Sequence, residues 1–415
     1  MSELPVGPRP PLTAAMLQDL IAQAEPLARE AHRLLAPVAS RRAPLRQRLL
    51  QAGEIEPFLS RSAAVLPSAS IAAVDGGSVR EHLYAADLMV AVAASAEGMT
   101  SAAHLPLGQR HWAAVRTHES DNDRLLAAAM AGLELCLIAS LQHDLRLLDG
   151  SHGTPVIALS TALSARSPAV AQAAADLVTD EVVDALAALA DPDRRTAPGE
   201  VVALPKADSS TAFSERYLRA HGLDLPGGDR FVAAQVLGPG EMLRPRPADE
   251  LADVHVSARD DATPHVRAVA DRLDEAVAPL RRAAAADEVV VTYLRPTTAE
   301  TILKVEARVS EPLADARDGD DGGALAEVRR IAALLSAETP GPHLQEPFAQ
   351  YAVDLAAKAV STGAEALNEA LLANLPDGSE DYLMWLARSY RTRVTPSPAR
   401  TSARPPANRP EAPPG

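Results

Sequence analysis

Three stretches of the sequence each end an apolar run with an aspartate and then continue into small residues. They are residues 71–78 (Ile-Ala-Ala-Val-Asp-Gly-Gly-Ser), 147–151 (Leu-Leu-Asp-Gly-Ser) and 201–209 (Val-Val-Ala-Leu-Pro-Lys-Ala-Asp-Ser). An apolar run bounded by turn residues predicts a buried strand, so we expect Asp75, Asp149 and Asp208 at strand ends. Asp-Gly is also the commonest hairpin turn, in which Asp75 would only shape a corner. The recurrence of the pattern favours a shared site.

Converging aspartates are suited to binding a hard divalent cation such as Mg²⁺ or Mn²⁺. Without an ion, packed carboxylates repel one another and raise each other's pKa. Two ions roughly 3.5–4 Å apart can hold the attacking water and the leaving oxygen of a phosphodiester. Glu134 in a predicted helix adds a fourth carboxylate, and Lys206 can bind a phosphate or the developing negative charge. The structural alternatives are a helix residue that touches solvent and a surface lysine at a strand end.

The periodicity predicts the elements that must position these residues. Helices are expected over residues 12–50 (one or two), 124–142, 168–189, 209–221 and 263–285, with two or three more between 323 and 391. Strands are expected over 71–75, 81–94, 112–115, 145–149, 154–159, 201–204, 230–237, 289–294 and 302–307. Three hairpins follow from this pattern: 71–75 with 81–94, 145–149 with 154–159, and 289–294 with 302–307. The fold class is therefore α/β.

Composition limits the classes of protein. The 415 residues are 47% hydrophobic and 3% aromatic, so Ala, Leu and Val must fill the core. Cys136 is the single cysteine, which excludes a disulfide framework and a cysteine-based zinc cluster and fits a reducing cytoplasm. The N-terminus has no signal-peptide pattern. Glu134 lies in the middle of the most apolar helix, residues 125–141, which argues against a membrane span.

The net charge differs between the C-terminal tail and the rest of the chain. The net charge is −15, which disfavours non-specific binding to DNA. Residues 391–415 hold five arginines and one glutamate, so this tail carries +4 and the rest carries −19. We expect three parts: an N-terminal helical segment (1–65), a catalytic domain (66–390) and a disordered Pro/Arg-rich tail (391–415). The tail either contacts DNA or an acidic partner surface, or only solubilises the chain.

The order of the motifs resembles the NurA nucleases. It runs from Val74-Asp75-Gly76 through Glu134 and Leu148-Asp149-Gly150-Ser151 to Lys206-Ala207-Asp208-Ser209. The later Tyr293-Leu294-Arg295 and Lys304-Val305-Glu306 are similar to paired strands of that family. The resemblance covers residues 70–358 and implies an RNase H-like mixed sheet flanked by helices. It also implies a Mn²⁺-dependent DNA nuclease with 5′-to-3′ exonuclease activity, a homodimer, and a partnership with the hexameric ATPase HerA in DNA end resection.

The last family motif differs in this chain. The family has Tyr-Pro followed by a helical histidine, whereas this sequence has Glu346-Pro347 and, at the histidine position, Asp354. An aspartate can also bind a hard metal, so we include Asp354 among the expected catalytic residues. A carboxylate on the surface of a helix is the alternative. The expected catalytic set is Asp75, Glu134, Asp149, Lys206, Asp208 and Asp354, with the metal ions held by Asp75, Glu134, Asp149 and Asp208.

Two alternatives to a cytoplasmic DNA nuclease remain at this point. A non-catalytic subunit that binds DNA ends or a partner protein could use the same fold, because fold does not fix function. A metal-dependent phosphatase or ribonuclease would use the same carboxylates. Retention of Asp75, Glu134, Asp149 and Asp208 together favours the nuclease, since a binding module does not need four carboxylates at one point.

Overall fold

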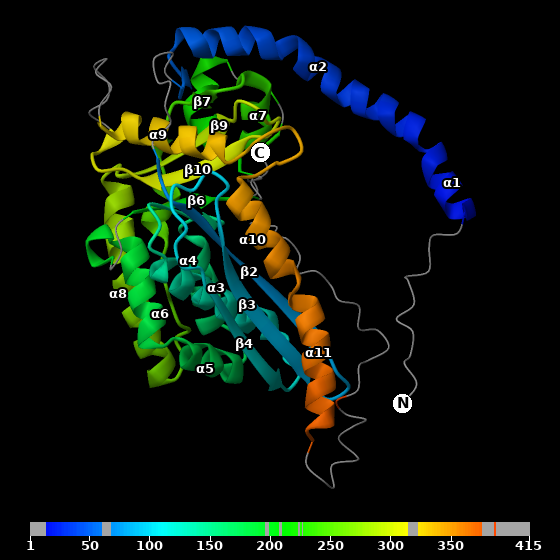
Figure 1. Ribbon diagram of the computed structural model, residues 1–415, viewed down its shortest axis with the longest axis vertical. Helices are drawn as coiled ribbons and strands as arrows, with labels where there is room; N and C mark the ends of the chain where they lie inside the picture. The colour runs from blue at the N-terminus through cyan, green and yellow to red at the C-terminus, as the bar shows by residue number, and fades with distance from the viewer. Residues whose placement is uncertain are drawn as a thin grey trace, which may run out of the picture.

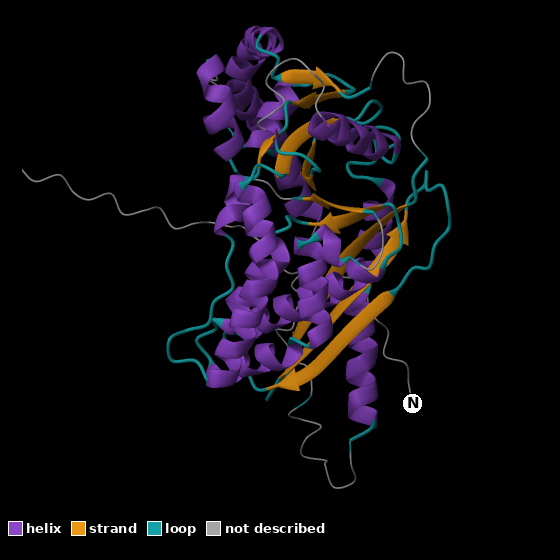
Figure 2. Ribbon diagram, turned by 90° about the vertical axis from the view of Figure 1, so that its left-hand side faces the viewer, coloured by secondary structure: helices purple, strands orange, loops and turns teal. Residues whose placement is uncertain are grey.

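A ten-stranded mixed sheet crosses the molecule, and helices cover both of its faces (Figures 1 and 2). The computed structural model describes residues 14–59, 68–195, 199–206, 210–222, 225, 227–313, 323–375 and 386. The strand order is β1-β7-β9-β10-β6-β5-β2-β3-β4, with β8 paired to β9. This architecture confirms the predicted α/β class. Asp208, residues 314–322 and the tail 391–415 lie outside the described residues.

The strands are β1 (Ile55–Pro57), β2 (Ile71–His82), β3 (Asp87–Glu97), β4 (Gln109–Arg116), β5 (Leu145–Asp149), β6 (Glu200–Leu204), β7 (Glu241–Leu243), β8 (Arg246–Pro247), β9 (Val289–Arg295) and β10 (Leu303–Arg308). The first six helices are α1 (Ala14–Ala22), α2 (Ala24–Gln51), α3 (Asn122–Ser140), α4 (Thr154–Leu163), α5 (Pro168–Leu177) and α6 (Asp180–Ala190). The others are α7 (Asp229–Val236), α8 (Pro264–Ala285), α9 (Gly323–Ala337), α10 (Phe348–Lys358) and α11 (Val360–Ala373). Short 3₁₀ or π turns are η1 (Pro192–Arg194), η2 (Ser214–Leu218), η3 (Arg219–His221) and η4 (Asp249–Asp253).

The centre of the sheet consists of three parallel strands, β2, β5 and β6. Parallel neighbours need a crossover connection, and helices supply it here: α3 precedes β5, and α4 to α6 separate β5 from β6. The hairpin predicted for 145–149 with 154–159 is therefore wrong. Residues 154–159 begin α4, with Pro155 in its first turn, where a proline is tolerated.

The two faces of β2 pack against different helices. Ala72 and Val74 belong to the core formed with α3 and its neighbours, whereas Ile71 and Ala73 belong to the core under α9 and α10. This alternation follows from the two-residue period of a strand. In Figure 1, α10 and α11 run along β2 and β3 on the side opposite to α3. Side chains at odd positions of β2, including Asp75, therefore face α10.

Other predictions of secondary structure were confirmed or corrected. The strands at 145–149, 201–204 and 289–294 and the antiparallel β9–β10 pair are confirmed. Residues 230–237 were expected as a strand but form α7, whose buried side chains follow helical spacing. The single helix expected over 168–189 is interrupted at Val178 and Thr179, where the chain is not helical.

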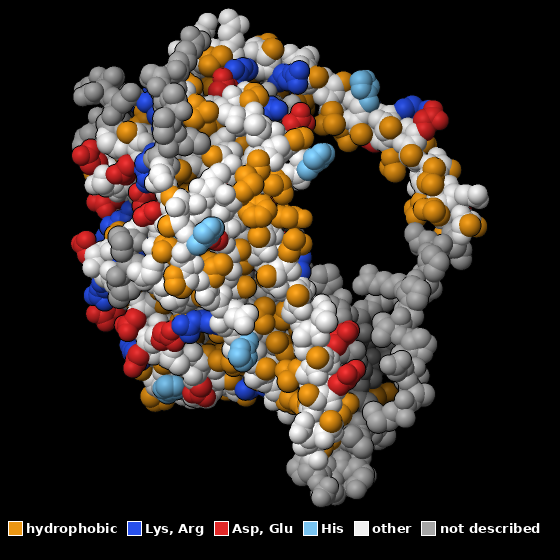
Figure 3. Space-filling model, in the orientation of Figure 1, with side chains coloured by type: hydrophobic (Ala, Val, Ile, Leu, Met, Phe, Trp, Pro, Cys, Tyr) orange, Lys and Arg blue, Asp and Glu red, His pale blue; other side chains and the backbone are white. Residues whose placement is uncertain are grey.

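The N-terminal helices extend away from the sheet. In Figure 1, α2 leaves the top of the molecule and α1 lies at its far end. Only Val38, Leu45 and Leu49 of α2 are buried, and no residue of α1 is. Figure 3 shows hydrophobic side chains gathered along the exposed part of this arm. Within the described part of the chain, every helix is too short or too polar to cross a bilayer.

Candidate active site

Asp75 lies inside β2, with seven residues of the strand after it. We predicted a strand end followed by a turn at Gly76 and Gly77, and that prediction is wrong. The two glycines continue the strand and pair with Ala93 and Val92 of β3. Because they have no side chain, two helices can approach the strand closely at these positions.

A different helix packs closely against each of the two glycines. A Cβ at Gly77 would lie 2.1 Å from the backbone oxygen of Ala357 in α10, and a Cβ at Gly76 would lie 2.2 Å from Glu134 Oε1 in α3. Both distances are shorter than a carbon–oxygen contact can be. Glycine at these positions therefore lets α10 and α3 approach β2 on either side of Asp75.

Asp149 reaches the site through the parallel pairing of β5 with β2. Val74 pairs with Leu148, so the next residues, Asp75 and Asp149, lie side by side at the same face. Gln350 of α10 donates from Nε2 to Asp149 Oδ1 at 3.0 Å. The predicted strand end at Asp149 is confirmed.

Lys206 follows β6, the parallel neighbour of β5. Arg230 of α7 donates to the backbone oxygens of Lys206 and Pro205 at 2.5 and 2.9 Å, which fixes this segment. The Lys206 ammonium lies between four carboxylates. Its Nζ is 3.1 Å from Glu346 Oε2, 3.4 Å from Asp149 Oδ2, 3.5 Å from Asp354 Oδ1 and 3.6 Å from Asp75 Oδ2.

The chain just before and within α10 supplies three of these side chains. Gln350 and Asp354 are four residues apart and lie on one side of α10, whereas Glu346 precedes Pro347, the N-cap of that helix. Asp354 also pairs with Lys358. From the sequence we predicted Asp354 in the site but not Glu346 or Gln350. The helical spacing of four from Asp354 was the signal that could have identified Gln350.

Electrostatics at the site are dominated by excess negative charge. Burial, followed by the charges of Asp149 and Asp354, raises the pKa of Asp75 to about 7, against the opposing effect of Lys206. Burial alone would lower the pKa of Lys206, but Asp149, Asp75 and Glu346 outweigh it and raise that pKa. One ammonium therefore balances only part of the charge of four carboxylates.

These residues have the ligand chemistry of a divalent-metal site, but among the described residues only another group brings three metal-ligating atoms within 4.8 Å of one another. All four acidic partners offer hard oxygen ligands, which Mn²⁺ and Mg²⁺ prefer. Glu346 Oε2 is buried and has an ion pair with Lys206 but no hydrogen bond. The Lys206 ammonium lies where a cation is required, so a metal ion bound by Asp75, Asp149, Glu346 and Asp354 would require Lys206 to move aside.

One predicted ligand, Glu134, is placed differently from the expectation. Glu134 is buried on α3, and its carboxylate contacts the α3 side of β2 at Gly76, whereas Asp75 faces α10. The two carboxylates thus approach β2 from opposite faces. Asp208 lies outside the described residues. The structure brings Asp75, Asp149, Lys206 and Asp354 together, and the shared metal ligation of Glu134 and Asp208 stays a prediction.

A second buried carboxylate supports the turn after Asp149. Glu306 of β10 accepts hydrogen bonds at Oε2 from Ser151 Oγ at 2.7 Å and from His152 N at 3.2 Å. Burial would raise the pKa of Glu306, but His152, Lys304 and Ser151 outweigh it and lower that pKa. Sequence analysis treated Glu306 only as part of a strand pair. Its position indicates a role in holding the Gly150–Ser151 turn.

Comparisons with known proteins identify the fold. No protein-family model matches the sequence, and no curated protein sequence matches it significantly. The structure is similar to that of the NurA nuclease from Sulfolobus solfataricus, with a TM-score of 0.52 and 13% identity over 88% of this chain and 99% of that chain. A further NurA structure aligns with a TM-score of 0.44 and 11% identity over 84% of this chain and 98% of that one. A NurA structure bound to dAMP and manganese aligns with a TM-score of 0.37 and 11% identity over 78% and 94%. From the first of these likenesses, which extends over most of both chains, this chain has the fold of the NurA nucleases.

Proposed function

We propose that this chain is a metal-dependent DNA nuclease. The observation that carries the proposal is the convergence of Asp75, Asp149, Glu346 and Asp354 on Lys206, within a NurA fold. A non-catalytic binding subunit would gain nothing from burying repelling carboxylates at one point, because unpaired buried charge destabilises the folded state. The site therefore favours catalysis over simple binding.

The four carboxylates would hold the metal, Mn²⁺ or Mg²⁺, as one ion or two. When bound, the metal supplies a Lewis acid that stabilises negative charge on a phosphodiester. Lys206, displaced from the carboxylates, would keep its positive charge because the ordinary pKa of a lysine, about 10.4, lies well above neutral pH, and it could bind a phosphate oxygen. Gln350 would keep Asp149 oriented through its hydrogen bond. In hydrolysis, the water oxygen would bond to phosphorus as the bond from phosphorus to the leaving oxygen breaks. A carboxylate would take the proton of the water, and the leaving oxygen would take a proton from solvent.

The finer features of the activity belong to the same proposal. The resemblance of the motifs to NurA supports 5′-to-3′ exonuclease and single-strand endonuclease activity on DNA, in end resection during double-strand break repair with a HerA-like ATPase. A negative body with a charge of −19 should recruit DNA slowly, so a ring-shaped ATPase that feeds the strand would compensate. The exposed apolar side chains of α1 and α2 are suited to contacting such a partner. The homodimer and the cytoplasmic location stay predictions.

A nuclease assay with defined substrates tests the proposal. The full chain, freed of metal and then given Mn²⁺, should degrade DNA labelled at its 5′ or 3′ end, and the released label gives the polarity. Asp149→Asn should lower the rate at least about 100-fold, because even residues that only orient metal ligands cost 10–100-fold when changed. Asp184→Asn, an exposed aspartate on α6, is the matched control and should cleave like the wild type.

Two outcomes would contradict the proposal. Absence of Mn²⁺-dependent cleavage by the wild-type chain, with DNA binding retained, would favour the binding subunit. Equal rates for Asp149→Asn and Asp184→Asn would show that the activity comes from a contaminant or from another site. Parallel assays with labelled RNA and a phosphomonoester distinguish a deoxyribonuclease from a ribonuclease or phosphatase.

A further inference from the structure

A second group of metal-ligating side chains lies at the other end of the β2–β3 hairpin. His82 ends β2, Asp87 begins β3 and pairs with it, and His118 follows β4. Asp75 and His82 are seven residues apart on one strand, which separates them by about 23 Å at 3.3 Å per residue. The group is therefore distinct from the carboxylates around Lys206.

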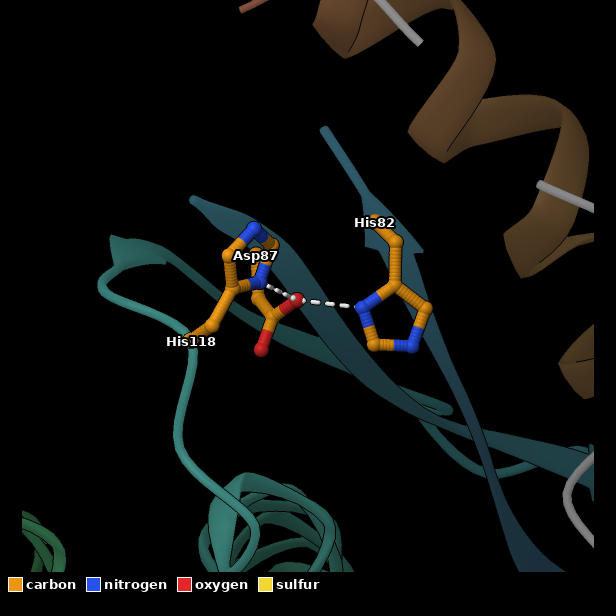
Figure 4. A group of neighbouring side chains, drawn as sticks. All are labelled: His82, Asp87 and His118. Atoms are coloured by element: carbon orange, nitrogen blue, oxygen red, sulfur yellow. Dashed lines mark hydrogen bonds and ion pairs between the residues drawn. The ribbon is translucent and has the colours of Figure 1, made fainter. Parts of the chain in front are cut away.

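The geometry of the group is centred on one oxygen atom. Asp87 Oδ1 is 2.7 Å from His82 Nδ1 and 2.9 Å from His118 Nδ1 (Figure 4). The two imidazole rings face this oxygen from either side, and the three ligand atoms all lie within 4.8 Å of one another. Asp87 is buried, while the side chains of His82 and His118 are 49% and 43% exposed. An ion could therefore enter from solvent and retain a water molecule.

Neighbouring groups fix the central carboxylate. Asn122, the first residue of α3, donates from Nδ2 to Asp87 Oδ2 at 2.7 Å and to the Thr117 backbone oxygen at 2.9 Å. Oδ1 is thus the oxygen that is turned toward the two rings. Fixed orientation of a ligating carboxylate by an outer hydrogen bond is typical of metal sites.

The hydrogen bonding of His118 argues for a cation. Its Nε2 lies 3.3 Å from the Tyr84 backbone oxygen, which can only accept a hydrogen bond, so the tautomer protonated at Nε2 is the one that satisfies this contact. In the neutral ring, Nδ1 then directs a lone pair at Asp87 Oδ1. Two lone pairs at 2.9 Å need a proton or a metal ion between them. A histidine that donates one ring N–H to a backbone carbonyl while the other nitrogen ligates is the usual arrangement at metal sites.

One neighbour opposes cation binding. The Arg80 guanidinium contacts His82 Nε2 at 3.2 Å through Nη2 and pairs with Asp123 at 3.2 Å through Nη1. For His82 to ligate through Nδ1, its ring proton must move to Nε2 and Arg80 must turn toward Asp123. The positive charge of Arg80 weakens binding, so we expect a moderate affinity.

We propose that His82, Asp87 and His118 bind one borderline divalent ion, of which Zn²⁺ is the best match. Two imidazoles and a carboxylate with an open fourth position form a ligand set that Zn²⁺ accepts, whereas the all-oxygen set around Lys206 suits Mn²⁺ or Mg²⁺. The ion would link the ends of β2 and β3 to the segment before α3, the helix that carries Glu134. The two sites are thus separated by position and by ligand chemistry.

Zinc titration of the metal-free, tag-free full chain tests this site. Calorimetry should show one equivalent of Zn²⁺ that Asp149→Asn retains and that His82→Gln and His118→Gln bind roughly tenfold or more weakly. Both histidines are half-exposed, so these variants should fold, as their thermal unfolding in EDTA will show. His111→Gln, an exposed histidine of β4 outside the group, is the matched control and should bind like the wild type.

Co²⁺ provides a second readout that does not depend on affinity. The wild-type chain should show the visible absorption of tetrahedral Co²⁺, and His82→Gln and His118→Gln should lose it. The proposal is overturned if the wild-type chain binds no Zn²⁺, or if the two variants bind Zn²⁺ with wild-type stoichiometry and affinity. It is also overturned if Asp149→Asn removes the Zn²⁺ equivalent, because the ion would then belong to the Lys206 site.

Discussion

Lys206 is the cation that its four carboxylate partners share. A single ammonium lies within 3.6 Å of one oxygen from each carboxylate and offsets part of their mutual repulsion. The repulsion that Lys206 does not offset acts on Asp75. Burial and the charge of Asp149 raise the pKa of Asp75 to about 7. Near neutral pH, the Asp75 carboxylate therefore exchanges between its protonated and ionised forms.

Asp75→Asn should change how stability depends on pH in the metal-free chain. The pKa of Asp75 is 3.8 in a free side chain and about 7 in the folded chain, so the folded state binds more protons between these values. Wild-type stability is then highest below pH 3.8 with respect to this group and falls as the pH rises to about 7. Because Asn does not ionise, the unfolding free energy of Asp75→Asn relative to that of the wild type should increase across that window, by at most about 1.4 kcal/mol per pH unit.

Urea unfolding in EDTA at several values between pH 5 and pH 8 measures this difference. Asp184→Asn controls for the general loss of a carboxylate. If the unfolding free energies of the wild type and Asp75→Asn stay a constant distance apart across that range, the raised pKa of Asp75 is wrong.

At the scale of elements, two glycines of β2 bring the helices to the site. Gly77 allows the backbone of α10 to approach, and α10 carries Gln350 and Asp354. Gly76 allows Glu134 of α3 to reach the opposite face. The strand thus separates two helices, α3 and α10, that carry the predicted site residues on its opposite faces.

Gly77→Ala should displace α10 and lower both stability and activity. The added methyl group meets a backbone oxygen that cannot rotate away, and overpacking of this kind costs about 1–3 kcal/mol. Gly363→Ala is the matched control, because Gly363 of α11 has open space around its Cα and Ala favours a helix by up to about 1 kcal/mol. Chemical unfolding and the Mn²⁺-dependent cleavage rate measure the two effects. Equal stability of the two variants would contradict the close packing of α10 on β2.

Some elements could be predicted from the sequence, and others could not, for identifiable reasons. β9 was found because it is a short run of β-branched and aromatic residues, and β5 because its leucines end at the turn residues Asp149 and Gly150. The turn assigned to Gly76 and Gly77 failed because a glycine needed for helix packing looks the same in sequence as a glycine in a turn. Residues 154–159 failed because the parallel pairing of β5 and β6, a long-range feature, decides that a helix must follow β5.

The candidate site was predictable to a similar degree. Asp75, Asp149, Lys206 and Asp354 were identified and are brought together. Glu346 was not identified because it replaces a tyrosine of the NurA motif and lies before α10 begins, outside the helical spacing that links Gln350 to Asp354. Glu134 approaches the other face of β2 because side chains alternate along the strand and Gly76 faces α3. We predicted that the strand ends at Asp75, so this alternation at Gly76 could not be foreseen.

At the scale of the whole molecule, the exposed arm and the negative body suggest dependence on a partner. Met16, Leu17, Leu20 and Ile21 of α1 are 48–63% exposed and form a stripe of four apolar side chains. Such a surface is costly in water, and a partner that covers it removes that cost. The tail, whose five arginines could assist DNA binding, lies outside the described residues and its role stays a prediction.

Leu17→Glu combined with Ile21→Glu should abolish binding to the cognate HerA-like ATPase and leave the cleavage rate of the isolated chain unchanged. Both side chains are exposed on α1, far along the chain from the carboxylates around Lys206. Gln18→Glu adds a negative charge to the same helix outside the apolar stripe and should bind normally. Co-purification and ATP-dependent resection of linear duplex DNA measure the outcome. The partnership is wrong if the isolated chain degrades long duplex as fast and as far as the mixture does.

Anomalous diffraction from crystals grown with Mn²⁺ tests the central claim most directly. We predict a manganese peak among Asp75, Asp149, Glu346 and Asp354, with the Lys206 ammonium moved out of the position it occupies between them. Asp149→Asn crystals grown in the same way should show a weaker peak or none. Lack of any peak at these carboxylates at saturating Mn²⁺, in a chain that cleaves DNA with Mn²⁺, would place the catalytic metal elsewhere and contradict this account of the site.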